Sequence, residues 1–351
     1  MAGNKKQIRI TIFWTMIFIV QMLFFQFLPR FPKLLQTFNV FFEKQKYVHI
    51  AIFSRQNFPW GDIFYLLLGM GLIIWLMLQC KKWSWRRMNL FLLSLIIFSL
   101  LYQIFWGIRY QHPPIDKDIY LQKFSDREIK SVAEKIIFSA NTLRQQISEE
   151  EFHNPPEEII KKSTHSILHQ QKKNLPPSEQ YNISIPHVKT SLYTPILNYL
   201  GVWGYYNPFT AEANINRNLP SVALPFTAAH EMAHQMGVAR EGEASFVGYL
   251  YATQSNDAFL AYSAYLQAIS YVVAMIKDEK IREEIKQNIH PKVLKDMDTK
   301  RQFSQQYAGQ LNTFFSQLND WFLKSNQQEG IISYSTVGNY IVGYELLHTN
   351  K

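Results

Sequence analysis

The sequence has almost no cysteine and none of the patterns typical of nucleic-acid binding. Cys80 is the only cysteine among 351 residues, so no intrachain disulfide can form. Zinc-finger spacing, RNA-recognition stretches and basic–aromatic repeats are all missing, which argues against a nucleic-acid partner. Internal repeats and low-complexity tracts are missing as well. The chemistry must therefore be sought in single motifs.

The charge of the chain is strongly basic. Lys and Arg number 36 against 27 acidic residues, for a formal net charge of +9. A basic balance is compatible with nucleic acid, an anionic membrane surface or simple solubility. Here many cations flank apolar segments, so contact with a lipid bilayer explains the charge better than contact with nucleic acid.

Three long apolar runs stand in the first third of the chain, at about 8–28, 63–80 and 89–108. Each supplies roughly the 20 residues that a hydrocarbon core requires, so we predict three transmembrane helices. The first run is longer than the apolar region of a signal peptide, and no small-x-small cleavage site follows it. We therefore expect a retained anchor, in which Gln21 and Gln26 can hydrogen-bond to neighbouring helices.

Loop charges predict the orientation of these helices. The short link KKWSWRR, residues 81–87, carries four cations, and Lys5, Lys6 and Arg9 precede or begin the first run. The positive-inside rule places both segments in the cytoplasm, so residues 109–351 would lie on the extracytoplasmic side. The segment FNVFFEKQKYVHIAIF, residues 38–53, is expected along the interface as an amphipathic element.

Residues 109–351 are predicted to form a mainly helical α+β domain, following a membrane domain of residues 1–108. Ser125 and Glu128 have the spacing of a capping box at the start of a helix over 125–148. Between residues 199 and 225 the chain is rich in Gly, Pro, Asn and aromatics, which indicates loops and a small sheet. The candidate strands are AEANINR (211–217) and SVALP (221–225). Further helical patterns cover 157–171, 243–273, 278–289 and 300–325.

The stretch AAHEMAHQMGVAREGEASF, residues 228–246, carries the chemistry. His230 and His234 are four residues apart, so on a helix they share one face and can bind one Zn²⁺. Glu231 lies on the adjacent flank, where it can hold a water molecule and take its proton. We expect Thr227 to cap this helix and Gly237 to end it.

A catalytic zinc usually takes a third protein ligand, and Glu241 and Glu243 are the candidates. They lie about 200° apart on the next helix, so both cannot face one metal. Glu241 is favoured, because Ser245 then falls one turn further on, where it can hydrogen-bond a ligand histidine. Arg240 could neutralise the other glutamate or hold a substrate carboxylate.

Other polar and aromatic residues have weaker claims to a role. Tyr205 or Tyr206 could donate a hydrogen bond to a developing oxyanion, and Tyr206 is our candidate. The strand AEANINR could be the edge on which an extended peptide lies, although a loop is an equal alternative. His165 and His169 form a second pair with i, i+4 spacing, but no glutamate follows His165, so a solvated helix face is predicted.

The HEMAHQMG and EGEASF segments resemble the gluzincin pattern, in which HExxH precedes a helix bearing E-x-x-A-D or E-x-E-A-N, with Ser245 where that pattern has Asp or Asn. More closely, the chain resembles the DUF3810 family of bacterial membrane-anchored HExxH proteins, over nearly its whole length. The shared segments are FWGIRYQHPP, GYYNPFTAEANIN and LPFTAAHEMAHQMG. This resemblance implies a multi-pass protein of the bacterial inner (cytoplasmic) membrane with a zincin-like domain.

The sequence therefore predicts a membrane-anchored metallopeptidase that uses Zn²⁺ to hydrolyse peptide bonds in a peptide or protein. The alternative is a non-catalytic zinc-binding sensor or assembly protein of the envelope, built on a peptidase scaffold. The intact His-Glu-His set favours the enzyme, because a structural zinc has no need of Glu231.

Overall fold

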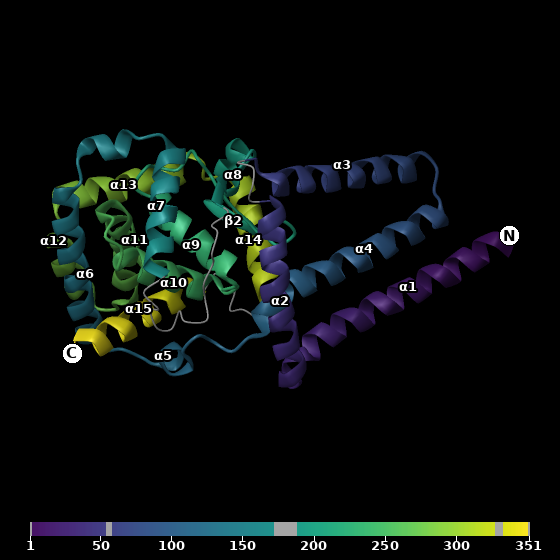
Figure 1. The fold of residues 1–351 in the computed structure, drawn as a ribbon, viewed down its shortest axis with the longest axis horizontal. Coiled ribbons are helices and arrows are strands. Elements are labelled where there is room, and N and C mark those ends of the chain that lie inside the picture. The colour runs from purple at the N-terminus through teal and green to yellow at the C-terminus, as the bar shows by residue number, and fades with distance from the viewer. Residues whose placement is uncertain (1, 54–57, 172–187, 327–332, 350–351) are drawn as a thin grey trace. The chain divides into compact units, whose positions relative to one another are not determined.

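The computed structural model describes residues 2–53, 58–171, 188–326 and 333–349. The chain divides into two compact units. Unit 1 comprises residues 1–112 together with 208–211, and unit 2 comprises residues 113–207 and 212–351. Helices dominate both units, and a three-stranded sheet belongs to unit 2 (Figure 1). The predicted class, mainly helical with a small sheet, is thus confirmed.

Unit 1 is built from long helices. The three apolar runs coincide with α1 (Ala2–Phe27), α3 (Trp60–Lys81) and α4 (Trp85–Phe105). The segment over 38–53, expected at the interface, forms most of another helix, α2 (Pro32–Phe53). Short 3-10 turns follow α1 and α4, at Leu28–Arg30 and Gly107–Gln111.

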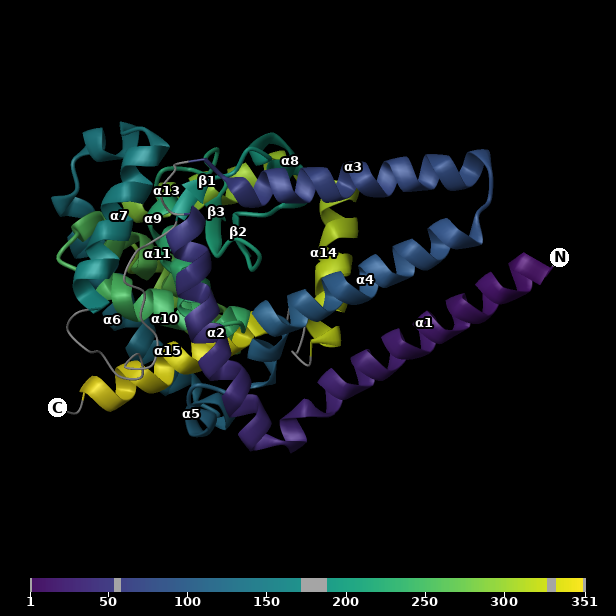
Figure 2. The ribbon, with the colours of Figure 1, turned by 45° about the vertical axis from the view of Figure 1, so that its right-hand side comes forward.

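Polar side chains join α1 to α4, which run side by side (Figures 1 and 2). Gln21 Nε2 donates to Ser99 Oγ at 2.9 Å, which confirms the predicted interhelical role of Gln21. Near the other end of the pair, Thr11 Oγ1 donates to Asn89 Oδ1 at 2.7 Å. Hydrogen bonds of this kind between helices in a bilayer contribute about 0.6–2 kcal/mol each.

Four helices in the described part of the chain are long and apolar enough to cross a membrane. They are Asn4–Arg30, α3, α4 and α11 (Ala258–Met275). Most of the apolar side chains of the first three are not buried within the protein, which indicates association with a lipid bilayer. The fourth, α11, has more than half of its apolar window buried inside unit 2, against α6, α9 and α10. Core packing therefore accounts for its apolar residues.

The sheet of unit 2 has the order β1-β3-β2. The central strand β3 (Glu212–Ile215) pairs in parallel with β1 (Val188–Thr190) and antiparallel with β2 (Gly204–Asn207). The prediction of a strand in AEANINR is confirmed by β3, but the suggestion that this strand is an edge is wrong, because β3 has partners on both sides. The prediction of a strand in SVALP is also wrong: its last two residues open the helix α9, where Pro225 fits the first turn.

The helices of unit 2 follow the predicted patterns with two added breaks, one within 243–273 and one within 300–325, where α13 ends at Gln306 and α14 begins at Gln310. The capping box of Ser125 and Glu128 starts α6 as predicted. The pattern over 243–273 is split, because Asp257 accepts hydrogen bonds from the amides of Phe259 and Leu260 and starts a new helix. The helices are α5 (Lys117–Leu121), α6 (Asp126–Gln146), α7 (Pro156–Gln171), α8 (Thr194–Leu200), α9 (Leu224–Met236), α10 (Glu241–Thr253), α11, α12 (Glu279–Gln287), α13 (Pro291–Gln306), α14 (Gln310–Ser325) and α15 (Ser333–Thr349), with a 3-10 turn at Glu149–His153.

Helix α9 lies at the centre of unit 2, in contact with α7, α10, α11 and β3 (Figure 1). All of its residues are buried except His230, which is partly exposed. Helix α10 approaches closely because Gly248 has no side chain: a Cβ there would lie 3.1 Å from the His230 amide nitrogen. This close crossing places the first turn of α10 beside the histidines of α9.

Candidate metal centre

The turn between α9 and α10 brings the two halves of the motif together. Gly237 adopts the left-handed conformation (φ 102°) that an L side chain rarely takes, and so ends α9 as predicted. The Val238 amide then donates back to Ala233 O at 3.1 Å. The predicted cap at Thr227 is wrong, because α9 begins one turn earlier and the Thr227 hydroxyl donates to Ala223 O from inside the helix.

Three of the predicted residues form one cluster. The ligand atoms of His230, His234 and Glu241 all lie within 4.8 Å of one another. The two Nε2 atoms are 3.1 Å apart, and Glu241 oxygens lie 3.2 Å from His230 Nε2 and 3.7 Å from His234 Nε2. Solvent reaches the cluster, because His230 is 15 % and Glu241 is 23 % exposed.

The opposite ring nitrogens are held by neighbouring groups. His234 Nδ1 lies 2.7 Å from Val238 O, and a carbonyl can only accept, so this nitrogen carries the proton. In the neutral ring, Nε2 of His234 must then present a lone pair to the cluster. His230 Nδ1 lies 3.0 Å from Ser245 Oγ, which confirms the predicted contact of Ser245 with a histidine of the motif.

The donor set fits a divalent cation. Two imidazole lone pairs and a carboxylate are all acceptors, so their convergence requires a proton or a metal ion between them. Without a metal, burial lowers the pKa of His234, but the Glu241 carboxylate outweighs burial and raises this pKa to about 9. Burial alone would raise the pKa of the Glu241 carboxyl. The adjacent His234 and His230 have the opposite and larger effect, so this pKa lies below its usual range. Nitrogen and oxygen ligands in this number suit Zn²⁺ with one position open.

Glu243, the other candidate ligand, lies in different surroundings. Its Oε1 accepts from the Ile115 amide at 3.2 Å and lies 3.4 Å from the Tyr340 hydroxyl. Arg240 Nε lies 3.8 Å from the same oxygen, as expected if Arg240 neutralises the glutamate that does not join the histidines. The structure thus brings Glu241, and not Glu243, to the cluster.

Glu231 is almost fully buried beside the cluster, at 3 % exposure. Its Oε2 has no hydrogen-bond partner among the described residues, and burial raises the pKa of its carboxyl. A buried carboxylate oxygen without a partner is costly, so its presence points to a function. The backbone of Gly204 on β2 covers it: a Cβ at residue 204 would lie 2.5 Å from Glu231 Oε1.

The two tyrosines of β2 point to opposite faces of the sheet. Side chains alternate along a strand, so Tyr206 shares the face of Gly204 toward α9, and Tyr205 does not. The Tyr205 hydroxyl lies 3.0 Å from Ser191 Oγ on the other face. Tyr206 therefore lies on the face of the sheet that is turned toward the cluster, in agreement with its choice as the candidate for contact with substrate.

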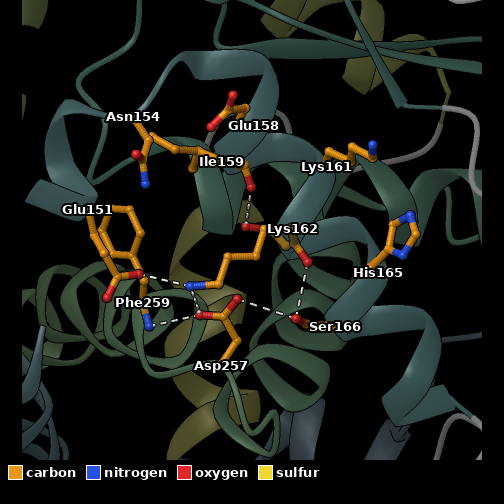
Figure 3. Close-up of a pocket in the computed structure, with 11 residues that line it drawn as sticks. Glu151, Asn154, Glu158, Ile159, Lys161, Lys162, His165, Ser166, Asp257 and Phe259 are labelled. Atoms are coloured by element: carbon orange, nitrogen blue, oxygen red, sulfur yellow. Dashed lines mark hydrogen bonds and ion pairs between the residues drawn. The ribbon is translucent and has the colours of Figure 1, made fainter.

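A cavity of about 470 Å³ lies elsewhere in unit 2, and none of the clustered residues lines it (Figure 3). Lys162 crosses it, 2.8 Å from Glu151 Oε2 and 3.7 Å from Asp257 Oδ1. His165 lies at its rim, and both His165 and His169 are exposed, as predicted for a solvated face.

Two further contacts at the cluster were not predicted from the sequence. The hydroxyl of Tyr271 on α11 hydrogen-bonds Ser245, and Gly204 packs on Glu231. Both contacts join segments far apart in the chain. In the sequence, Gly204 is one residue of an aromatic, Gly-rich stretch, and Tyr271 is one of several tyrosines in its helix. Neither position carried a signal that pointed to the cluster.

Fold and site together define a helical protein with membrane-length apolar helices and a His-His-Glu cluster beside a buried glutamate. The chain belongs to the family described as "Protein of unknown function (DUF3810)", whose match covers residues 38–342. No curated protein and no solved structure is significantly similar to the chain.

Proposed function

We propose that the protein is a membrane-anchored, zinc-dependent metallopeptidase with a zincin-like domain. The observation that carries the proposal is the convergence of His230, His234 and Glu241 on one point, next to the buried carboxylate of Glu231. A bound Zn²⁺ would polarise the scissile carbonyl and lower the pKa of a coordinated water.

Side chains of the protein would bind the ion, transfer the proton and contact the oxyanion. His230 and His234 would hold the ion through Nε2, because Ser245 and Val238 contact their Nδ1 atoms. Glu231 takes the proton of the attacking water and passes it to the leaving amine. Its elevated pKa, caused by burial, suits a group that must both accept and release a proton. Tyr206 donates a hydrogen bond to the oxyanion.

The edge strand β2 supports a peptide substrate. β2 pairs only with β3 in the sheet of the described residues, and its Gly204 lies against Glu231. An extended peptide that lay along β2 would run past the general base. In this proposal the strand beside which the peptide lies is β2, with the sequence GYYN, and not the AEANINR segment.

Glu231→Gln tests the enzymatic role, because the amide preserves size and cannot accept the proton. Full-length protein in detergent, loaded with zinc, should cleave a randomised peptide library, and the variant should lose about 10³-fold or more of this rate. Cleavage by the wild type and variant at equal rates would refute the role of the base. Bound zinc with no turnover in the wild type would instead favour the alternative, a zinc-binding envelope protein without catalysis.

We further propose that α1, α3 and α4 cross the bacterial inner membrane and that residues 109–351 lie outside the cytoplasm. The cations of the 81–87 link and of the N-terminus support this orientation. Alkaline phosphatase fused after residue 351 should be active, and after residue 84 inactive. The reverse pattern would overturn the orientation.

A further inference from the structure

Lys300 on α13 is a partly buried cation that has no acidic partner among the residues the structure describes. Its Nζ donates to Gln267 Oε1 at 2.5 Å, and no carboxylate among the described residues lies within ion-pair distance of it. Partial burial lowers the pKa of Lys300 to about 8, so the group is still mainly protonated at pH 7.

Other partly or fully buried cations of unit 2 are neutralised. Lys189 Nζ lies 2.7 Å from Glu212 Oε1, and Arg144 Nε lies 2.6 Å from Asp296 Oδ2. Even the exposed Lys162, at the other cavity, has two carboxylates near it. Burial of a charge without a partner is unfavourable, so the missing anion of Lys300 calls for an explanation.

A chain of side-chain contacts leads from Lys300 to the cluster. Gln267 receives the Lys300 bond and also hydrogen-bonds the hydroxyl of Tyr271, four residues further along α11. The same hydroxyl hydrogen-bonds Ser245, whose Oγ lies 3.0 Å from His230 Nδ1. Two side chains, those of Gln267 and Tyr271, therefore separate Lys300 from Ser245, the serine that contacts His230.

A second contact joins Lys300 to the residue that directly precedes β2. Its Nζ lies 5.4 Å from the centroid of the Trp203 ring. Trp203 directly precedes Gly204, whose backbone covers Glu231, and the Trp203 carbonyl accepts from the Asn216 amide at 2.9 Å, next to the β2–β3 pairing. Lys300 thus contacts both Gln267, the start of the side-chain path to His230, and Trp203, the residue before the glycine that covers Glu231.

We propose that Lys300 binds a carboxylate of the substrate, so that the substrates are peptides with an anionic group close to the scissile bond. An ammonium–carboxylate contact is a charge-assisted hydrogen bond, and the indole face of Trp203 adds a favourable surface for the cation. The carboxylate comes either from the free C-terminus of the peptide or from an Asp or Glu side chain. This inference rests on the proposed peptidase function.

Binding is measured separately from turnover. Full-length Glu231→Gln protein in detergent, loaded with zinc, is mixed with randomised N-acetyl tetrapeptides, and bound peptides are quantified by affinity selection and mass spectrometry. Three mixtures are compared: free acids without Asp or Glu, amides without Asp or Glu, and amides with one Asp or Glu. We expect one of the two carboxylate-bearing mixtures to bind at least about tenfold more tightly than the neutral amides. Which one does so identifies the source of the carboxylate.

Lys300→Met should remove this preference, and Lys300→Gln should do the same while keeping a polar side chain. Lys300→Arg should restore part of it. Lys295→Met, an exposed lysine of the same helix, should leave it intact. Equal binding of the three mixtures to the Lys300 protein, no detectable binding of any, or a preference that survives in folded, zinc-loaded Lys300→Met and Lys300→Gln would overturn the inference.

The outcomes also separate this inference from the peptidase proposal. Cleavage of acids and amides at equal rates by the protein with Glu231 intact, unchanged by Lys300→Met, would retain the peptidase and refute the role of Lys300. A carboxylate preference that depends on Lys300, without cleavage of any mixture, would retain the binding role and refute the peptidase.

Discussion

The backbone of Gly204 on β2 lies directly against the carboxylate of Glu231 on α9. A Cβ at residue 204 would lie 2.5 Å from Oε1, 2.7 Å from Cγ and 2.8 Å from Cδ of that glutamate. Contacts this short do not occur between real atoms, so any side chain at this position must displace the glutamate. The position of the proposed general base thus depends on a missing side chain in a neighbouring strand.

Gly204→Ala should therefore lower kcat by about 10- to 100-fold, because a displacement of roughly 1 Å is enough to misplace a catalytic group. Bound zinc should be unchanged, since the three atoms nearest to such a Cβ all belong to Glu231 and none to the three clustered residues. Gly309→Ala is the matched control, because nothing lies within 4 Å of a Cβ there. Equal kcat values for the two variants would contradict this arrangement.

Tyr206→Phe should reduce kcat by about 10²-fold, the usual cost of removing one oxyanion donor, with little change in KM. Tyr205→Phe provides the comparison, because its hydroxyl contacts Ser191 on the opposite face of the sheet. Steady-state kinetics of the two variants distinguish the faces. A larger loss of kcat in Tyr205→Phe would assign the donor to the other tyrosine.

Ser245→Ala should weaken zinc binding by about 10- to 100-fold, the typical effect of losing a group that orients a ligand histidine. The dissociation constant can be measured by competition with a chromogenic chelator. Ser325→Ala, which removes an exposed hydroxyl that donates to Trp321 O, should bind zinc as the wild type does. Unchanged affinity in Ser245→Ala would mean that His230 needs no such support.

Arg144→Met should destabilise unit 2 by about 3 kcal/mol, because Asp296 would remain largely buried without its cation. The ion pair secures α13 one turn before Lys300, and the Tyr262 hydroxyl also donates to Asp296, at 2.6 Å. Arg301→Met is the control, since Arg301 is 66 % exposed and its change should stay within about 0.5 kcal/mol. Chemical denaturation of the two variants gives the comparison, and equal losses would contradict it.

The parts of the site that depend on local spacing could be predicted from the sequence. The i, i+4 histidines, the helix end at Gly237 and the placement of Ser245 one turn after Glu241 all follow from helix geometry over residues 228–246. The same geometry predicted that only one of Glu241 and Glu243, about 200° apart, can face the histidines, and the structure brings the favoured residue, Glu241, to them.

The parts that depend on pairing between distant segments could not be predicted. β1, β2 and β3 have only three or four residues each, too few for an alternating pattern, so the order of the sheet and the role of Gly204 stayed hidden. The contact of Lys300 with Gln267 and Trp203 joins three segments of unit 2. Helix breaks such as that at Asp257 were missed because a helical periodicity continues across them.

Zinc content of two matched variants tests the central claim most directly. Full-length wild-type protein, Glu241→Gln and Glu243→Gln, purified identically and dialysed against zinc, are compared by inductively coupled plasma mass spectrometry. The account predicts one zinc per chain in the wild type and in Glu243→Gln, and a loss of most of it in Glu241→Gln. Equal zinc in Glu241→Gln and the wild type, or none in the wild type, would contradict it.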